Sequence, residues 1–75
     1  MNMTLSTERD HYEQARAVRA QAAHDLYEAE LALHDAHQTQ VDTWILAASN
    51  HLHTAVLTYT RAEHALAALS TPAAG

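Results

Sequence analysis

Two hydrophobic repeats of seven residues run along the chain, and they are out of phase with each other. In residues 5–36, large side chains and alanines alternate at spacings of four and three residues, and the same alternation fills residues 41–69. This spacing is typical of helices that pack along a coiled-coil seam. The first frame, if continued, would place its next large residue at position 47, whereas the second frame places it at Ile45. We interpret this phase jump as a chain reversal between about residues 37 and 43.

The pattern therefore predicts an all-α protein, an antiparallel two-helix hairpin with an Ala/Leu coiled-coil seam. We place the first helix at 7–38, the turn at about 38–42 and the second helix at 43–70. Residues 1–6 are short and polar, and residues 71–75 contain Pro72 and Gly75, so both ends are expected to be disordered. Two helices of this length enclose little interior, so we expect assembly into a four-helix bundle or docking on a larger protein.

The predicted seam sets small side chains against large ones. When residues whose numbers sum to 81 are paired, seven of the eight layers place an alanine opposite a larger side chain, which lets two helices approach closely. The same register brings Arg16 near Glu63. The expected seam residues are Tyr12, Ala15, Ala22, Leu26, Ala29, Leu33, Ala36, Ile45, Ala48, Leu52, Ala55, Tyr59, Ala62, Leu66 and Leu69.

Each helix carries a second apolar row away from the seam. A helix that is apolar on two sides is usually buried on two sides, although scattered apolar residues on a monomer's surface are the alternative interpretation. We predict a protein-binding interface, with self or with a larger protein as the partner, formed by Tyr27, Leu31, Trp44, Leu46, His53, Val56 and Leu57.

Composition narrows the range of functions. The 75 residues contain no Cys, so disulfide scaffolds and cysteine-ligated zinc fingers are excluded. Four Arg, no Lys and nine acidic residues give a net charge of −5, which argues against a nucleic-acid partner. Residues 43–60 are uncharged but too polar for a membrane span, and residues 1–8 lack the pattern of a signal peptide. We therefore expect a cytoplasmic protein, and the lack of Lys beside abundant Ala and His suggests a bacterial or phage source.

The seven histidines raise two alternative functions. Glu30, His34 and His37 share one arc of the first helix and Asp42 follows the turn, so these four residues are a candidate divalent-metal site. Histidines in the second apolar row could instead make an assembly sensitive to pH, because imidazoles gain a proton between pH 7 and 5. Otherwise no cofactor is expected.

Motifs of catalysis are missing from the sequence, which has no Gly-rich phosphate loop, Cys nucleophile or Gly-x-Ser-x-Gly elbow. We therefore expect a protein that is not an enzyme. The hairpin layout resembles the Rop-type plasmid regulators, which dimerise into a four-helix bundle and bind RNA. Trp44 near the turn and the run from Tyr59 to Glu63 resemble the Trp-x-Gly hairpins of type VII secretion and their Tyr-x-x-x-Asp/Glu signal, although Leu46 stands where that family has Gly. The latter resemblance implies a secretion-like hairpin partner.

Overall fold

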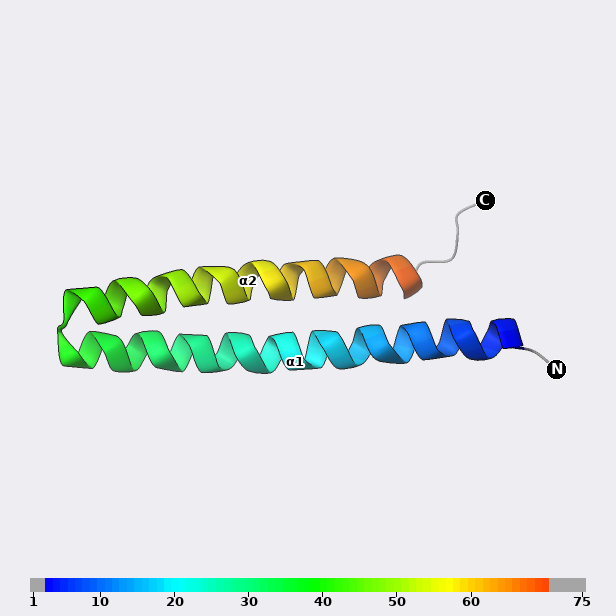
Figure 1. The fold of residues 1–75 in the computed structure, drawn as a ribbon, viewed down its shortest axis with the longest axis horizontal. Coiled ribbons are helices and arrows are strands. Elements are labelled where there is room, and N and C mark those ends of the chain that lie inside the picture. The colour runs from blue at the N-terminus through cyan, green and yellow to red at the C-terminus, as the bar shows by residue number, and fades with distance from the viewer. Residues whose placement is uncertain (1–2, 71–75) are drawn as a thin grey trace.

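The chain forms two long α-helices that lie side by side and run in opposite directions (Figure 1). In this computed structural model the backbone is described for residues 3–70 and the side chains for residues 9–69. Helix α1 spans Met3–Thr39 and helix α2 spans Asp42–Ser70, and no strand occurs between residues 3 and 70. The predicted all-α hairpin with two mutually packed helices is confirmed.

The helix bounds differ from the predicted ones mainly at the start of α1. We placed residues 1–6 in a disordered segment and began the helix at Thr7, but α1 begins at Met3. Residues 3–6 contain no Gly or Pro, so nothing in this segment stops the helix from extending. Residues 1–2 and the predicted tail 71–75 lie outside the described residues.

The turn is shorter than expected and depends on a left-handed residue. Gln40 has a φ of 59°, a conformation that usually ends helices at Gly or Asn. Its N–H donates to the His37 carbonyl at 3.2 Å. The Thr39 hydroxyl donates to the Ala36 carbonyl at 2.6 Å and accepts from the Val41 N–H at 3.2 Å. The hydroxyl thus joins the last turn of α1 to the first residue beyond the left-handed position.

The N-cap residue of helix α2 has a side chain that cannot accept a capping hydrogen bond. The Val41 carbonyl accepts the N–H groups of Trp44 and Ile45, both at 3.0 Å, so Val41 occupies the N-cap position, which Ser, Thr, Asp and Asn usually fill. Asp42 lies in the first turn of the helix, where its negative charge interacts favourably with the positive end of the helix dipole. The reversal therefore takes two residues, Gln40 and Val41.

The seam between the helices is formed almost entirely by the residues that the repeats indicate. Within residues 9–69 the buried side chains are Ala22, Ala29, Ala36, Ala55 and Ala62. The half-buried ones are Ala15, Leu26, Leu33, Ile45, Ala48, Ser49, Leu52, Tyr59 and Leu66. Every buried side chain is thus a single methyl group, and the larger seam residues remain partly open to solvent.

Three positions differ from the expected seam. Tyr12 and Leu69, which form the layer farthest from the turn, are 37% and 49% exposed. A layer at the open end of a hairpin has neighbours on one side only, so its side chains keep more contact with solvent. Ser49 is half-buried although it lies beside the expected rows; its small side chain sits four residues after Ile45, close to the turn.

The molecule is long and flat. Its principal extents are 59 × 25 × 12 Å and its radius of gyration is 17.3 Å, against about 11 Å for a compact chain of this length. It exposes 6000 Å², whereas a globular monomer of 8.2 kDa exposes about 4500 Å². The hairpin therefore leaves roughly 1500 Å² more surface in solvent than a compact fold of its mass.

Candidate protein-interaction surface

The two broad sides of the flat hairpin differ in character. Residues seven positions apart lie on the same side of a helix in a coiled-coil pair, so each side can be followed from a residue whose place is known. One side, which we call the apolar face, includes the position of Glu63 and therefore also Val56, seven residues earlier. The apolar face comprises Ala20, Ala23, Tyr27 and Leu31 from α1 and Leu46, His53, Val56 and Leu57 from α2, and the charged residues Arg16, Glu30 and Glu63 lie on the same side of the hairpin.

The apolar face carries large side chains that nothing in the hairpin covers. Tyr27 is 59% exposed and Leu46 is 62% exposed. Val56, Leu57 and Leu31 are also exposed, the last two at the outer edges of the face. The face thus gathers six of the seven residues that the sequence indicates as an interface, with the seventh elsewhere.

Trp44 is that seventh residue. It lies seven positions before His51 and fourteen before Thr58, and both of these residues line a groove on the opposite side of the hairpin. Its ring is exposed, but it does not belong to the apolar face. The apolar positions that predicted the interface covered a broad arc of α2, and this arc included Trp44 on the other side of the helix.

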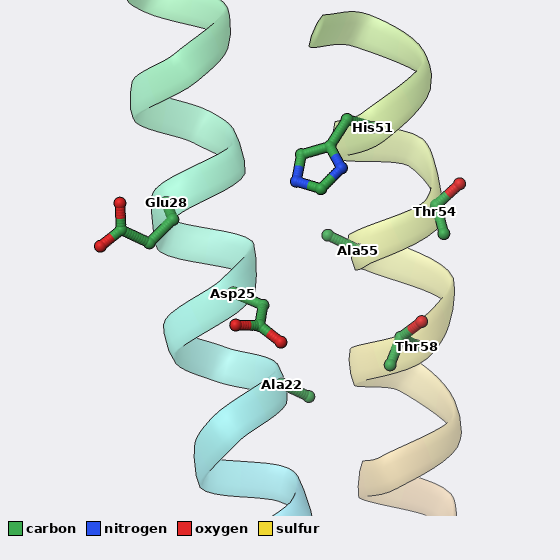
Figure 2. A pocket seen from close by; sticks show the side chains of 7 residues that line it. All are labelled: Ala22, Asp25, Glu28, His51, Thr54, Ala55 and Thr58. Carbon is green, nitrogen blue, oxygen red and sulfur yellow. The ribbon is translucent and has the colours of Figure 1, made fainter.

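The opposite side bears a groove that is lined by both polar and apolar side chains. This groove of about 400 Å³ has Ala22 and Ala55 among its lining residues, and its polar lining comes from Asp25, Glu28, His51, Thr54 and Thr58. The His51 ring and the Asp25 carboxylate extend into the space between the helices, whereas Glu28 lies at the outer edge (Figure 2). Asp25 also accepts a 2.9 Å hydrogen bond from the Gln21 amide. The groove thus places three titratable side chains, Asp25, Glu28 and His51, on the side of the hairpin opposite Val56.

A second, smaller groove lies near the open end of the hairpin. It has a volume of about 340 Å³, and Val18 lines it together with Ala65 and Leu69. Val18 is 53% exposed, and the sequence pattern does not indicate it, because it stands alone between Ala17 and Arg19 rather than in an apolar row. Its place opposite Ala65 follows only from the hairpin register.

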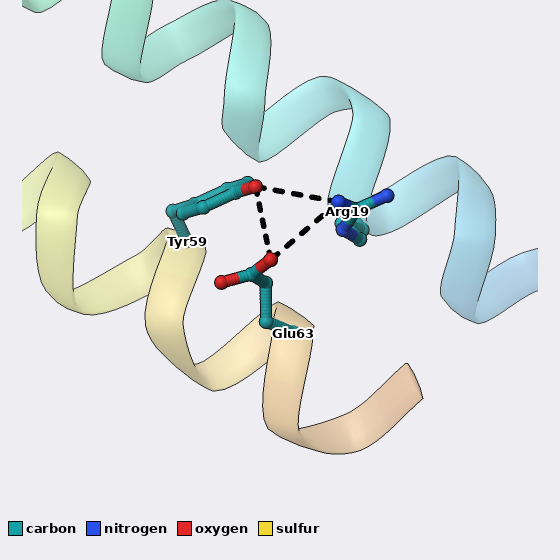
Figure 3. A network of polar contacts seen from close by, with 3 residues as sticks. All are labelled: Arg19, Tyr59 and Glu63. Atoms are coloured by element: carbon teal, nitrogen blue, oxygen red, sulfur yellow. Dashed lines mark hydrogen bonds and ion pairs between the residues drawn. The ribbon is translucent and has the colours of Figure 1, made fainter. Parts of the chain in front are cut away.

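A network of three side chains connects the helices in the outer half of the seam. The Tyr59 hydroxyl donates to Glu63 Oε2 at 3.0 Å (Figure 3). Arg19 Nη2 donates to the Tyr59 hydroxyl oxygen and to Glu63 Oε2, each at 3.5 Å. The hydrogen bond to Tyr59, together with the nearby Glu63 carboxylate, raises the pKa of Arg19 above its ordinary value. The network explains how a charged residue is accommodated at a seam position.

This network revises two expectations. Glu63 pairs with Arg19 and not with Arg16, and within residues 9–69 Arg16 takes part in no ion pair. Tyr59 and Glu63, the two defining positions of the Tyr-x-x-x-Glu pattern, are bonded to each other and to α1. Their spacing of four residues is thus accounted for by a structural role inside the hairpin.

The candidate metal residues are not brought together. In the described part of the chain, no group of three or more His, Cys, Asp or Glu side chains is placed to hold a metal ion. Glu30, His34 and His37 share one arc of α1 and are spread over about 10 Å of helix, and their side chains do not converge into such a group. Asp42 does not complete the site. The structure thus does not bring the four predicted metal ligands together, and the metal centre stays a prediction.

Comparisons with known proteins leave the surface as the main guide to function. No protein-family model, characterised protein or solved structure matches this chain. Over the described residues, neither helix combines the length and apolar character that crossing a bilayer requires.

Proposed function

We propose that this hairpin is a non-catalytic protein–protein interaction module that binds its partner through the apolar face. The observation that supports the proposal is that small side chains are buried in the hairpin while large apolar side chains are exposed. The buried side chains of residues 9–69 are all alanines, whereas the large side chains of Tyr27, Leu46 and Val56 are exposed to solvent. Folded proteins normally place such side chains inside, and contiguous exposed apolar surface marks sites of association.

The energetics of the hairpin support the same proposal. The seam removes methyl groups and parts of larger side chains from water, and burial stabilises by only about 25 cal/mol per Å². The 6000 Å² of exposed surface is about half of the roughly 12,000 Å² that an unfolded chain of this mass exposes, against about 60% buried in an ordinary domain of similar size. Covering the apolar face with a partner would bring the buried fraction to that of a typical domain.

Site-specific photocrosslinking tests this function without assuming a partner. A benzoylphenylalanine is introduced in place of His53, on the apolar face, or in place of Thr54, its exposed neighbour on the opposite side, in the cells that naturally make the chain. We expect irradiation to give discrete adducts from position 53 and not from position 54. The position-53 adducts should disappear when Leu46→Glu is added. Equal adducts from both positions, or none from either, would contradict the proposal.

A further inference from the structure

We propose that the partner of the apolar face is a second copy of this chain, bound through a two-fold axis that places the two turns at opposite ends of a four-helix bundle. The inference rests on the interaction function proposed above and identifies the partner. In this arrangement α1 packs antiparallel on α1 of the second copy, and α2 packs antiparallel on the second α2. Such an interface is isologous, so each contact occurs twice.

The surface that the hairpin exposes fits one such interface. A stable interface of standard size buries about 800 Å² on each partner. The excess of exposed surface over a compact monomer is roughly 1500 Å² per chain. This excess is larger than the area that one face-to-face contact would bury on each chain. The flat 59 × 25 × 12 Å shape also presents a broad side on which a second hairpin can lie.

The charges of α1 are arranged for antiparallel self-pairing. Arg16 and Glu30 lie seven residues on either side of Ala23, on the same side of the helix as Ala23. A two-fold axis at Ala23 therefore sets Arg16 of each copy against Glu30 of the other. With the axis close to Ala23, the same operation brings Tyr27 over Ala20, a large side chain over a small one.

The side chains of α2 are also arranged symmetrically about one residue, and this residue lies at the same height along the hairpin as Ala23. His53 and Glu63 are symmetric about residue 58, as are Val56 and Thr60. An antiparallel pair of α2 helices centred there sets His53 against Glu63 of the second copy. Residues 23 and 58 are opposite each other in the hairpin register, whose numbers sum to 81. Two patterns on separate helices thus share one axis, near the middle of the helical pair.

The two charged residues that would pair across the axis, Arg16 and Glu30, form no ion pairs within the described part of the hairpin. They are separated by fourteen residues of α1, or about 21 Å, so they cannot pair within one chain. Opposite charges at matching heights fix the register of an interface and exclude others.

Charge reversal tests the arrangement on the intact chain. Sedimentation equilibrium at neutral pH and low salt is measured for the wild type, Arg16→Glu, Glu30→Arg and the double variant. Matched controls are Arg61→Glu and Glu28→Arg, which make the same charge changes on the opposite side of the hairpin. Circular dichroism verifies that every variant remains helical.

We expect the wild type to have twice the 8.2 kDa mass of one chain. Each single reversal creates two like-charge contacts per dimer and should raise the dissociation constant roughly 10- to 100-fold. The double variant should return to within roughly threefold of the wild type, because the reversed charges pair again across the axis. The two control variants should lie within that same range.

Two results would overturn the inference. A wild-type mass of one chain at every concentration would exclude a second copy as the partner, while the crosslinking at positions 53 and 54 would still decide the interaction function separately. A dimer that the double variant fails to restore would exclude the antiparallel axis, since a bundle with both turns at one end keeps Arg16 and Glu30 about 21 Å apart in height.

Discussion

The Arg19 guanidinium carbon lies 5.9 Å from the centre of the Tyr59 ring, so the charged residue of the seam on α1 stacks over an aromatic side chain of α2. This distance allows a cation–π contact. The same Arg19 donates to the Tyr59 hydroxyl, which in turn donates to Glu63. One arginine thus contacts both the ring face and the hydroxyl of the tyrosine.

Replacing Tyr59 with Phe should destabilise the hairpin by no more than about 1 kcal/mol, because the ring is kept and the lost hydrogen bonds are solvent-exposed. Thermal unfolding followed by circular dichroism measures the change. Because the pKa of Arg19 is raised, its contribution is fully present below the unfolded-state value and is lost only at higher pH. The difference between Tyr59→Phe and wild type should therefore be constant from pH 6 to 8. Tyr59→Ala, which also removes the ring, should cost clearly more.

Ala29 is the most deeply buried residue of the seam, with no exposed surface. Ala29→Leu should force the helices apart and cost about 1–3 kcal/mol, measured by urea denaturation. Ala32→Leu introduces the same side chain one turn of helix away at an exposed position and should change stability by less than about 0.5 kcal/mol. Equal effects of the two substitutions would show that the seam is not closely packed.

Gln40 adopts a left-handed conformation that costs a residue with a Cβ about 1 kcal/mol. Gln40→Gly should therefore stabilise the hairpin by about 0.5–1 kcal/mol, the strain it removes outweighing the entropy it adds. Gln38→Gly, placed two residues earlier inside α1, should destabilise by a similar amount. A continuous helix through residues 38–43 would reverse the outcome at position 40, because glycine would then weaken it.

The proposed dimer gives a definite sign to the pH dependence of assembly. In the antiparallel arrangement His53 faces Glu63 and His34 faces Glu13 of the second copy, so protonated imidazoles gain carboxylate partners. Arg9 near His37 opposes this effect, and His24 already has Glu28 at 3.3 Å within its own helix. Positive charge on His53 and His34 would therefore add opposite-charge contacts across the proposed interface.

We therefore expect the dissociation constant to fall roughly tenfold between pH 8 and pH 6, measured by sedimentation. His53→Gln together with His34→Gln should remove most of the change. This sign is opposite to the loosening expected for histidines surrounded only by apolar groups. A dimer that weakens on acidification would contradict the assigned pairs.

The seam was the part of the fold that the sequence predicted best. A mismatch of two residues between the repeats was enough to locate the reversal, and the alternation of Ala with Leu or Tyr identified which side of each helix is covered. The turn residue itself could not be predicted, because Gln40 lacks the Gly or Asn signature of left-handed positions. The early start of α1 at Met3 was missed because residues 3–6, in which Met3 and Leu5 alternate with Thr and Ser, carry no strong signal for or against a helix.

The sequence defined the proposed interaction surface less completely than it defined the seam. Spacing of three and four residues identified Tyr27, Leu46 and Val56, but it did not separate the two broad sides of the hairpin, so Trp44 was included. The choice of Arg19 over Arg16 as the partner of Glu63 depends on side-chain reach and on Tyr59, neither of which a linear register contains. The candidate metal ligands share one arc of α1 in the sequence, but a linear pattern does not show whether their side chains converge, and the structure does not bring them together.

One distance between two labels tests the dimer arrangement most directly. The described chain has no cysteine, so Gln38→Cys, on the outer side of α1 near the turn, accepts a single spin label. With a two-fold axis at the height of Ala23, the two labels lie about 45 Å apart along the bundle, and pulsed electron paramagnetic resonance should give one distance near that value. A separation near 20 Å or shorter, or no dipolar coupling between chains at all, would contradict the account.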